Sequence, residues 1–208
     1  DEMLGKNFFK KKIKFENQPS LEAQVASLSD DIAYNSHDLE DGLKANLFKI
    51  EQLNDLPVIK DIVYKHKNKL KNNNKDLVLR QIIRDIINEM VKDVVLNTKR
   101  NLKKRKPRNI LDIYKSKNSY VSFSSKMLEF DQSLKEFLKY NMYLNNSVLD
   151  KTNKGKKTIF KLFHLLRKKP QKFFTKKTIS KKNKERSICD FIAGMTDRYA
   201  IQLYNSLK

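Results

Sequence analysis

Five carboxylates within twelve consecutive residues form the part of the sequence best suited to chemistry. The segment contains no Lys or Arg, although the formal net charge of the chain is +21. The carboxylates belong to Asp30, Asp31, Asp38, Glu40 and Asp41. Carboxylate oxygens are the ligands that hard divalent cations prefer. In so basic a chain, this segment is a candidate site for a bound cation.

Helical spacing organises the segment. Its apolar residues recur at the period of a helix, at Leu21, Val25, Leu28 and Ile32. On that helix Asp30, Tyr34 and Asp38 are each four residues apart and share one row. The row runs beside the apolar stripe, so we expect Asp30 and Tyr34 to be partly buried, and a buried carboxylate needs a partner or a metal. The alternative is a solvated acidic face that balances lysines elsewhere.

Three sequence blocks, in a fixed order along the chain, point to a known family. The first, within residues 19–43, contains Asp-Asp-Ile-Ala-Tyr-Asn-Ser-His-Asp-Leu-Glu-Asp-Gly. The second, residues 134–143, reads Leu-Lys-Glu-Phe-Leu-Lys-Tyr-Asn-Met-Tyr, and the third, within residues 188–204, contains Asp-Phe-Ile-Ala-Gly-Met-Thr-Asp-Arg-Tyr-Ala. Together they resemble the deoxyguanosinetriphosphate triphosphohydrolase-like proteins of the HD superfamily. The resemblance implies an all-α fold, the C-terminal part of a multi-helix HD-domain bundle, with at most a very short extended segment.

The resemblance also implies an activity. Such an enzyme is a metal-dependent triphosphoric monoester hydrolase, in which water attacks a deoxynucleoside triphosphate and releases the deoxynucleoside and triphosphate. Its cofactor is a divalent ion such as Mg or Mn. Asp30 stands at the position of the family's last metal ligand. Tyr34 and Asp38 match positions that face the deoxyribose, where Asp38 would accept a hydrogen bond from the 3′-hydroxyl.

The other metal ligands of the family do not occur in this chain. They are a His and a later His-Asp pair, expected before Asp30, but none of the 29 preceding residues is His. The histidines of the chain are His37, His66 and His164, and they lack metal-ligand spacing. We therefore expect a missing N-terminal half to supply the remaining ligands, and the isolated chain to be inactive, with no catalytic residue of its own.

The pattern of turns and charges predicts the organisation of the chain. We expect an irregular lead-in over 1–18, the C-terminal part of the HD-type helical domain over 19–150, and a C-terminal helical region over 151–208. The last region would contain a basic loop (168–184) and one terminal helix (187–207). Gly42 lowers helix stability, so we expect the first helix to bend or break there. Pro57 is suited to begin the second helix.

Positive charge is concentrated in two segments, and these segments allow functions other than hydrolysis. Residues 99–108 hold seven basic residues, and residues 151–186 hold fifteen against the single acidic Glu185. An AT-rich coding sequence would explain this surplus of lysine without any function. The clusters could also attract triphosphate or single-stranded nucleic acid. The alternatives to a hydrolase are thus a basic helical module that binds nucleic acid and a non-catalytic interaction module.

The remaining composition bears on location and partners. The single cysteine, Cys189, excludes an internal disulfide and suits a reducing cytoplasm, where we expect the protein to act. We expect that thiol to be buried in the last helix. No apolar run is long enough for a membrane span, so we expect no membrane partner. By family resemblance, the helical faces would build a homo-oligomer.

Overall fold

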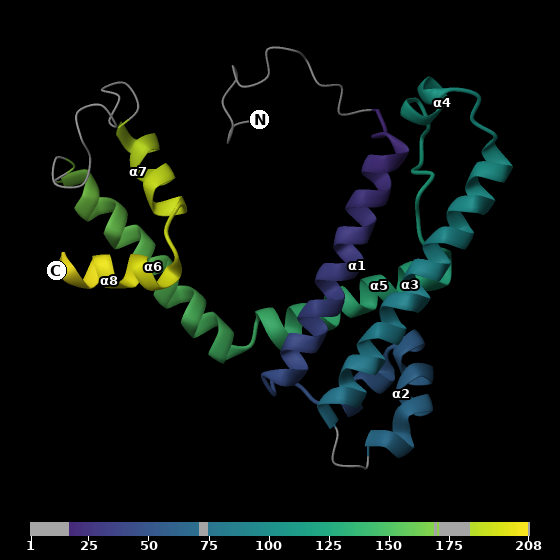
Figure 1. Ribbon diagram of the computed structural model, residues 1–208, viewed down its shortest axis with the longest axis horizontal. Coiled ribbons are helices and arrows are strands. Elements are labelled where there is room, and N and C mark those ends of the chain that lie inside the picture. Colours follow the sequence, from purple (N-terminus) through teal and green to yellow (C-terminus); the bar gives the residue numbers. More distant parts are fainter. Residues whose placement is uncertain (1–16, 71–74, 169, 171–183, 208) are drawn as a thin grey trace. The chain divides into compact units, whose positions relative to one another are not determined.

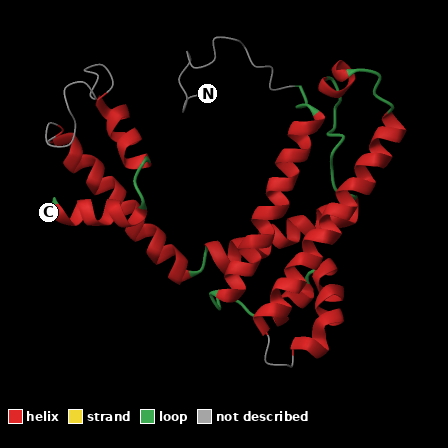
Figure 2. Cartoon of the chain, in the orientation of Figure 1, coloured by secondary structure: helices red, strands yellow, loops and turns green. Residues whose placement is uncertain are grey.

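A computed structural model describes residues 17–70, 75–168, 170 and 184–207. In this part of the chain every regular element is a helix and there is no strand (Figures 1 and 2). This confirms the predicted all-α fold class. Residues 120–124, where a short extended segment was allowed, form an irregular connection. None of the described helices is both long and apolar enough to cross a membrane.

The chain divides into two compact units, which meet between Met142 and Tyr143. The first unit contains α1 (Leu21–Lys44), the 3-10 helix η1 (Ile50–Asp55), α2 (Pro57–Leu70), α3 (Lys75–Arg105), α4 (Ile110–Tyr114) and α5 (Ser125–Leu138). Helix α3 packs against α1 and α2, and α5 packs against the same two helices (Figure 1). A π-helical turn, η2 (Lys139–Tyr143), continues α5 and crosses the boundary between the units.

Side-chain caps explain where several of these helices begin. The Ser20 hydroxyl accepts a hydrogen bond from the Ala23 N–H at the start of α1, at 3.3 Å. Pro57 is the first residue of α2, as predicted, because its missing N–H would have no partner there. Ser124 caps α5 by accepting from the Met127 N–H at 3.4 Å. Each cap satisfies a backbone donor that the helix leaves without an internal partner.

The core of the first unit is one continuous apolar cluster. Helix α1 contributes Ile32 and Leu39, α3 contributes a series that includes Ile82, Ile86 and Met90, and α5 contributes Phe130, Leu134 and Leu138. All three α3 residues named here are fully buried. The long α3 thus forms the central support against which α1, the helix of the candidate site, is held.

The break expected at Gly42 does not occur. Helix α1 continues through Gly42 to Lys44, and Gly42 is buried. The chain then turns back through Asn46, whose φ of 53° lies in the left-handed region that Asn tolerates. This turn brings Phe48 onto the open side of Gly42. A close contact with Phe48 therefore accounts for the glycine.

The second unit contains α6 (Asn146–Lys168), α7 (Lys184–Ala193) and α8 (Asp197–Ser206). Helix α6 packs against both shorter helices, around a small core of Leu162, Leu166, Ile188 and Ala200. The single terminal helix predicted over 187–207 is two helices, because the chain leaves α7 at Gly194 and Thr196 caps α8 by accepting from the Tyr199 N–H at 3.3 Å. The basic loop predicted over 168–184 lies almost entirely outside the described residues.

Cys189 corrects a second expectation in this unit. Its thiol is free and exposed, although we expected it to be buried. The neighbouring Ile188 takes the buried position of α7 instead. Adjacent residues on a helix point about 100° apart, so burial of one moves the next toward solvent.

Candidate functional site

The predicted site residues all lie on α1, and their exposure differs from the prediction. Asp30 is exposed, Tyr34 is 63% exposed and Asp38 is half-buried. The expected partial burial of Asp30 and Tyr34 is therefore wrong. The structure does place the three residues at successive turns of one unbroken helix.

The reason lies in which residues of α1 face the core. Its buried positions include Gln24, Ile32, Asn35, Ser36 and Leu39, whereas Val25 of the predicted stripe is 48% exposed. Residues two apart on a helix point to nearly opposite sides. Asp30 and Tyr34 each stand two residues from Ile32, and so they face away from the core. Two of the buried residues, Gln24 and Asn35, are amides, which an apolar pattern does not identify as core. The buried face of α1 therefore differs from the predicted apolar stripe.

The first of these amides, Gln24, fixes the beginning of α1. Its side-chain N–H donates to the Pro19 carbonyl at 2.8 Å. Its side-chain oxygen accepts from the Ser119 hydroxyl at 2.5 Å and from the backbone N–H groups of Tyr120 and Val121 at 2.9 and 3.1 Å. Since Gln24 is buried and makes four side-chain hydrogen bonds, it positions α1 against the connection before α5.

The second amide, Asn35, belongs to a polar network between α1 and α5. The side-chain N–H of Asn35 donates to the Asp131 carboxylate at 3.2 Å. The same buried carboxylate also pairs with the Lys135 ammonium at 2.8 Å. Lys135 reaches Asp31 at 3.3 Å as well. Burial disfavours the charged ammonium, but hydrogen bonds and attraction from Asp131 and Asp31 outweigh burial and raise the pKa of Lys135 above its ordinary value. The network ties the residue beside Asp30 to α5.

The residues of the described chain do not complete a metal site. Among them no group of three His, Cys, Asp or Glu side chains is arranged to hold an ion. His66 pairs instead with Asp85 at 3.0 Å between α2 and α3, and His164 packs against the ring of Phe160 in the second unit. Asp30 is therefore not part of such a group among the described residues.

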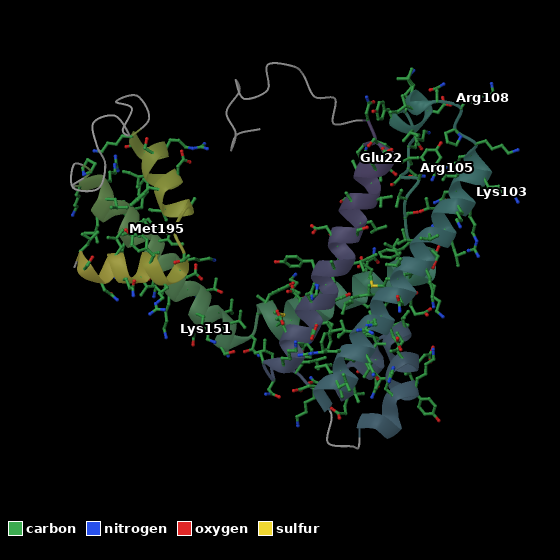
Figure 3. All side chains as sticks on the ribbon, in the orientation of Figure 1. Glu22, Lys103, Arg105, Arg108, Lys151 and Met195 are labelled. Carbon is green, nitrogen blue, oxygen red and sulfur yellow. The ribbon has the colours of Figure 1, made fainter. Side chains whose placement is uncertain are left out.

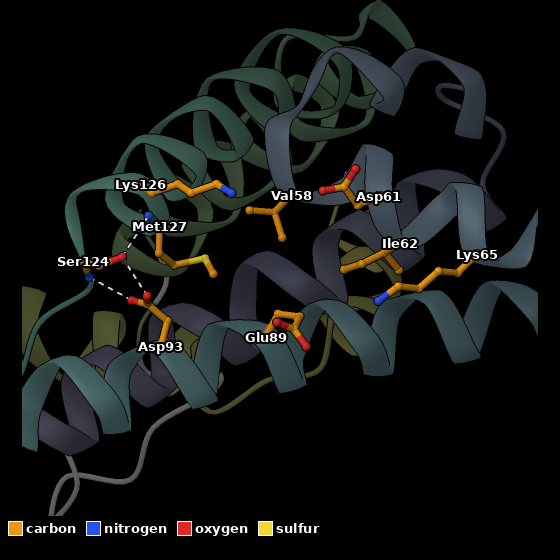
Figure 4. A pocket seen from close by; sticks show the side chains of 9 residues that line it. All are labelled: Val58, Asp61, Ile62, Lys65, Glu89, Asp93, Ser124, Lys126 and Met127. Carbon is orange, nitrogen blue, oxygen red and sulfur yellow. Dashed lines mark hydrogen bonds between the residues drawn. The ribbon is translucent and has the colours of Figure 1, made fainter.

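A charged pocket that no sequence pattern predicts lies between α2, α3 and α5 (Figure 4). It has a volume of about 190 Å³ and is lined by the carboxylates of Asp61, Glu89 and Asp93 and the ammonium groups of Lys65 and Lys126. Asp93 accepts hydrogen bonds from the Ser124 N–H at 2.8 Å and from the Ser124 hydroxyl at 2.6 Å. Asp93 thereby holds the cap of α5. These residues were not recognisable from sequence because they come from three separate helices.

Arg105, a member of the basic cluster at residues 99–108, has a structural role. Arg105 donates to the Ser116 hydroxyl and to the carbonyls of Asn118 and Ser119 at 3.1, 2.8 and 2.6 Å. Its guanidinium also lies 3.8 Å from the centre of the Tyr120 ring. Lys103 and Arg108, labelled with it in Figure 3, are exposed. The cluster is thus less cationic toward solvent than its sequence indicates.

Comparison with known proteins defines the class first. Residues 121–206 match the family model described as phosphohydrolase-associated domain. This match spans the end of the first unit and nearly all of the second. The chain therefore contains a phosphohydrolase-associated region.

Curated relatives then give a more specific similarity. The chain is 48% identical over 201 residues to a deoxyguanosinetriphosphate triphosphohydrolase-like protein of Pelagibacter ubique, covering 97% of this chain and 54% of that protein. Proteins of the same name from Rickettsia typhi and Bartonella tribocorum are 38% and 34% identical, each covering 90% of this chain and 50% and 48% of their own lengths. The chain is homologous to the deoxyguanosinetriphosphate triphosphohydrolase-like proteins, which confirms the resemblance, and it spans about half the length of the curated relatives it matches.

Proposed function

We propose that this chain is part of a metal-dependent deoxynucleoside triphosphate triphosphohydrolase. The observation that carries the proposal is the row of Asp30, Tyr34 and Asp38 at successive turns of α1, with Asp30 and Tyr34 turned away from the unit's own core and Asp38 half-buried at the edge of that face. The homology to proteins named triphosphohydrolase-like supports it. A helix face that the core leaves open is available to a substrate and to ligands from other parts of an enzyme.

Each residue of the row has a proposed role. Asp30 offers an oxygen ligand to a divalent ion such as Mg or Mn. Tyr34 presents a largely exposed ring that can pack on the deoxyribose. Asp38, one turn further on, accepts a hydrogen bond from the 3′-hydroxyl. Asp38 would thus orient the sugar through a hydroxyl that ribose and deoxyribose share, and only the packing of Tyr34 against the sugar could discriminate against a 2′-hydroxyl.

The chain by itself lacks the activity in this proposal. Its described residues assemble no group of three metal-ligating side chains, and so the isolated chain would not retain an ion through Asp30 alone. The remaining ligands and the groups that activate water would come from residues outside those described. We place the reaction in the cytoplasm, because the exposed Cys189 thiol persists best in a reducing compartment.

Triphosphate release from deoxynucleoside triphosphates, measured with Mg or Mn present, tests the proposal. The assay compares two samples. One is a longer protein that contains this chain together with the proposed remaining ligands, and the other is the isolated chain. Asp30→Asn is expected to abolish release, and Asp38→Asn to raise KM more than it lowers kcat. Asp41→Asn is the matched control, since Asp41 is also an exposed carboxylate of α1. Equal loss in the control, or full activity in Asp30→Asn, contradicts the proposal.

A further inference from the structure

The charged pocket between α2, α3 and α5 combines buried apolar side chains with exposed charged ones (Figure 4). Ile62 and Met127 are buried, whereas Asp61, Lys65 and Lys126 are exposed. The pocket volume of about 190 Å³ is several times the ~30 Å³ that one water molecule occupies in the liquid. The pocket therefore has room for a small organic molecule that contacts apolar and charged groups together.

Two of the carboxylates on this pocket already have partners within the protein. The Asp93 carboxylate accepts both of its hydrogen bonds from Ser124. The Glu89 carboxylate pairs with the Lys92 ammonium at 3.1 Å. These two acidic groups are therefore accounted for by contacts that hold the helices and their caps.

The other three charged groups of the pocket have no such partner. Among the residues that the structure describes, Asp61, Lys65 and Lys126 form no ion pair and no side-chain hydrogen bond. Asp61 and Lys65 stand one turn apart on α2, and Lys126 belongs to the first turn of α5. One negative and two positive charges from two helices thus line a single pocket without being neutralised by the described protein.

We infer that this pocket binds an acidic α-amino acid, glutamate or aspartate. Such a molecule carries two carboxylates and one ammonium, and so it supplies an opposite charge for each unpartnered group. Its carboxylates pair with Lys65 and Lys126 and its ammonium with Asp61, through charge-assisted hydrogen bonds. Its aliphatic carbons lie against Ile62 and Met127, as is usual in small-molecule sites that combine apolar lining with a few polar groups. The inference does not depend on the proposed hydrolase activity, since no residue of the α1 row takes part in it.

Other small ligands match these charges less completely. A phosphate or a plain dicarboxylate suits the two lysines but brings further negative charge toward Asp61, where like charges repel. A diamine suits Asp61 but is repelled by Lys65 and Lys126. A divalent cation lacks a coordination shell, because the described residues arrange no group of three His, Cys, Asp or Glu side chains to hold one. An acidic amino acid therefore suits the pocket better than these alternatives.

Isothermal titration calorimetry of the full chain with L-glutamate tests the inference. Asp61→Asn and Lys126→Gln are each expected to weaken binding about fivefold, since an ion pair open to solvent contributes up to about 1 kcal/mol. The matched controls are Asp55→Asn and Lys60→Gln, which remove exposed charges that do not line the pocket. Their affinity is expected to stay within about twofold of the parent. Circular dichroism verifies that all four variants keep their helices.

Comparison of ligands decides between the possible chemistries. Glutarate has both carboxylates but no amine, so it is expected to bind about fivefold more weakly than L-glutamate and to gain nothing from Asp61. Binding of L-aspartate in place of L-glutamate supports the inference. The inference is overturned if L-glutamate does not bind at millimolar concentration, or if glutarate or inorganic phosphate binds as tightly. It is equally overturned if the two control variants weaken binding as much as Asp61→Asn and Lys126→Gln, because the attraction would then belong to the general surface charge.

Discussion

The ring of Phe48 occupies the space that a Cβ at Gly42 would need. A Cβ built there would overlap the Cε1 and Cζ atoms of the ring. Phe48 is itself 4% exposed and packs edge-on against Phe137, with ring centroids 4.9 Å apart. The contact therefore links the end of α1, the turn after it and α5 in one packed group.

Gly42→Ala should destabilise the first unit by about 1–3 kcal/mol, the usual cost of forcing extra volume into a packed core. The ring of Phe48 can move only by leaving Phe137, so the higher helix propensity of Ala does not compensate. Urea unfolding followed by circular dichroism measures the change. An unchanged or higher midpoint would show that the ring can move freely, contrary to its burial.

Gly155→Ala is the matched substitution, and it should change the stability in the opposite direction to Gly42→Ala. Gly155 lies within α6 with no atom close to a Cβ built on it, among the described residues. Ala there should stabilise the helix by up to about 1 kcal/mol, because it loses less backbone entropy than Gly. Thermal unfolding of the two variants beside the parent gives the comparison, and a loss of stability in Gly155→Ala would contradict it.

Lys135→Gln should destabilise the protein by about 1–3 kcal/mol, since it leaves the buried Asp131 carboxylate with its Asn35 hydrogen bond but without its charged partner. Lys135 is about two-fifths exposed, so solvent screening keeps the loss at the lower end. The control is Lys92→Gln, which breaks the exposed pair with Glu89 and should cost less than about 0.5 kcal/mol. Equal losses in the two variants would mean that the buried network adds nothing.

The same pair gives a pH dependence with a definite sign. The pKa of Lys135 is raised in the folded protein, so its stabilising effect is fully present below the ordinary lysine value near ~10.4 and is lost as pH rises through the folded pKa. The difference in unfolding free energy between the parent and Lys135→Gln should therefore be constant near neutral pH and shrink at alkaline pH. A difference that persists at alkaline pH would rule out the ammonium as its cause.

Asp93→Asn should weaken the junction of α3 and α5. The carboxylate accepts two hydrogen bonds from Ser124, and Ser124 in turn caps α5 (Figure 4). An amide can accept from the Ser124 N–H and donate to the Ser124 hydroxyl, but it loses the negative charge that strengthens both hydrogen bonds, so we expect a loss of about 1–2 kcal/mol. Hydrogen exchange at the first turn of α5 should rise more than exchange elsewhere. Asp61→Asn, on the same pocket, serves as the control.

Arg105→Lys tests whether one residue of the basic cluster is structural. A lysine cannot reproduce the fork that reaches Ser116, Asn118 and Ser119, nor the guanidinium over Tyr120. We expect a loss of about 1–3 kcal/mol, whereas Lys103→Gln, an exposed neighbour, should stay within about 0.5 kcal/mol of the parent. The unfolding midpoints of the two variants test this prediction. Similar midpoints would mean that Arg105, like Lys103, is a solvated charge without a structural role.

Local sequence patterns are enough to predict the helical class and the helix that bears the candidate site. Helical periodicity and a scarcity of turn residues are local properties, and the row of Asp30, Tyr34 and Asp38 follows from a spacing of four whatever packs around it. Pro57 marked a helix start for an equally local reason, its missing donor. None of these conclusions depends on contacts between distant residues.

Tertiary packing, in contrast, sets which face of α1 is buried and which side chain lies against Gly42. Gln24 and Asn35 belong to the core because their partners, Ser119 and Asp131, come from some 95 residues further along the chain. Apolar periodicity treats such amides as surface residues. It therefore predicted the wrong buried face of α1 and a partial burial of Asp30 that the structure does not show. Gly42 looked like a helix breaker until the turn at Asn46 brought Phe48 onto it. Burial of a polar or small residue is a relation between distant segments, and a single local pattern does not contain it.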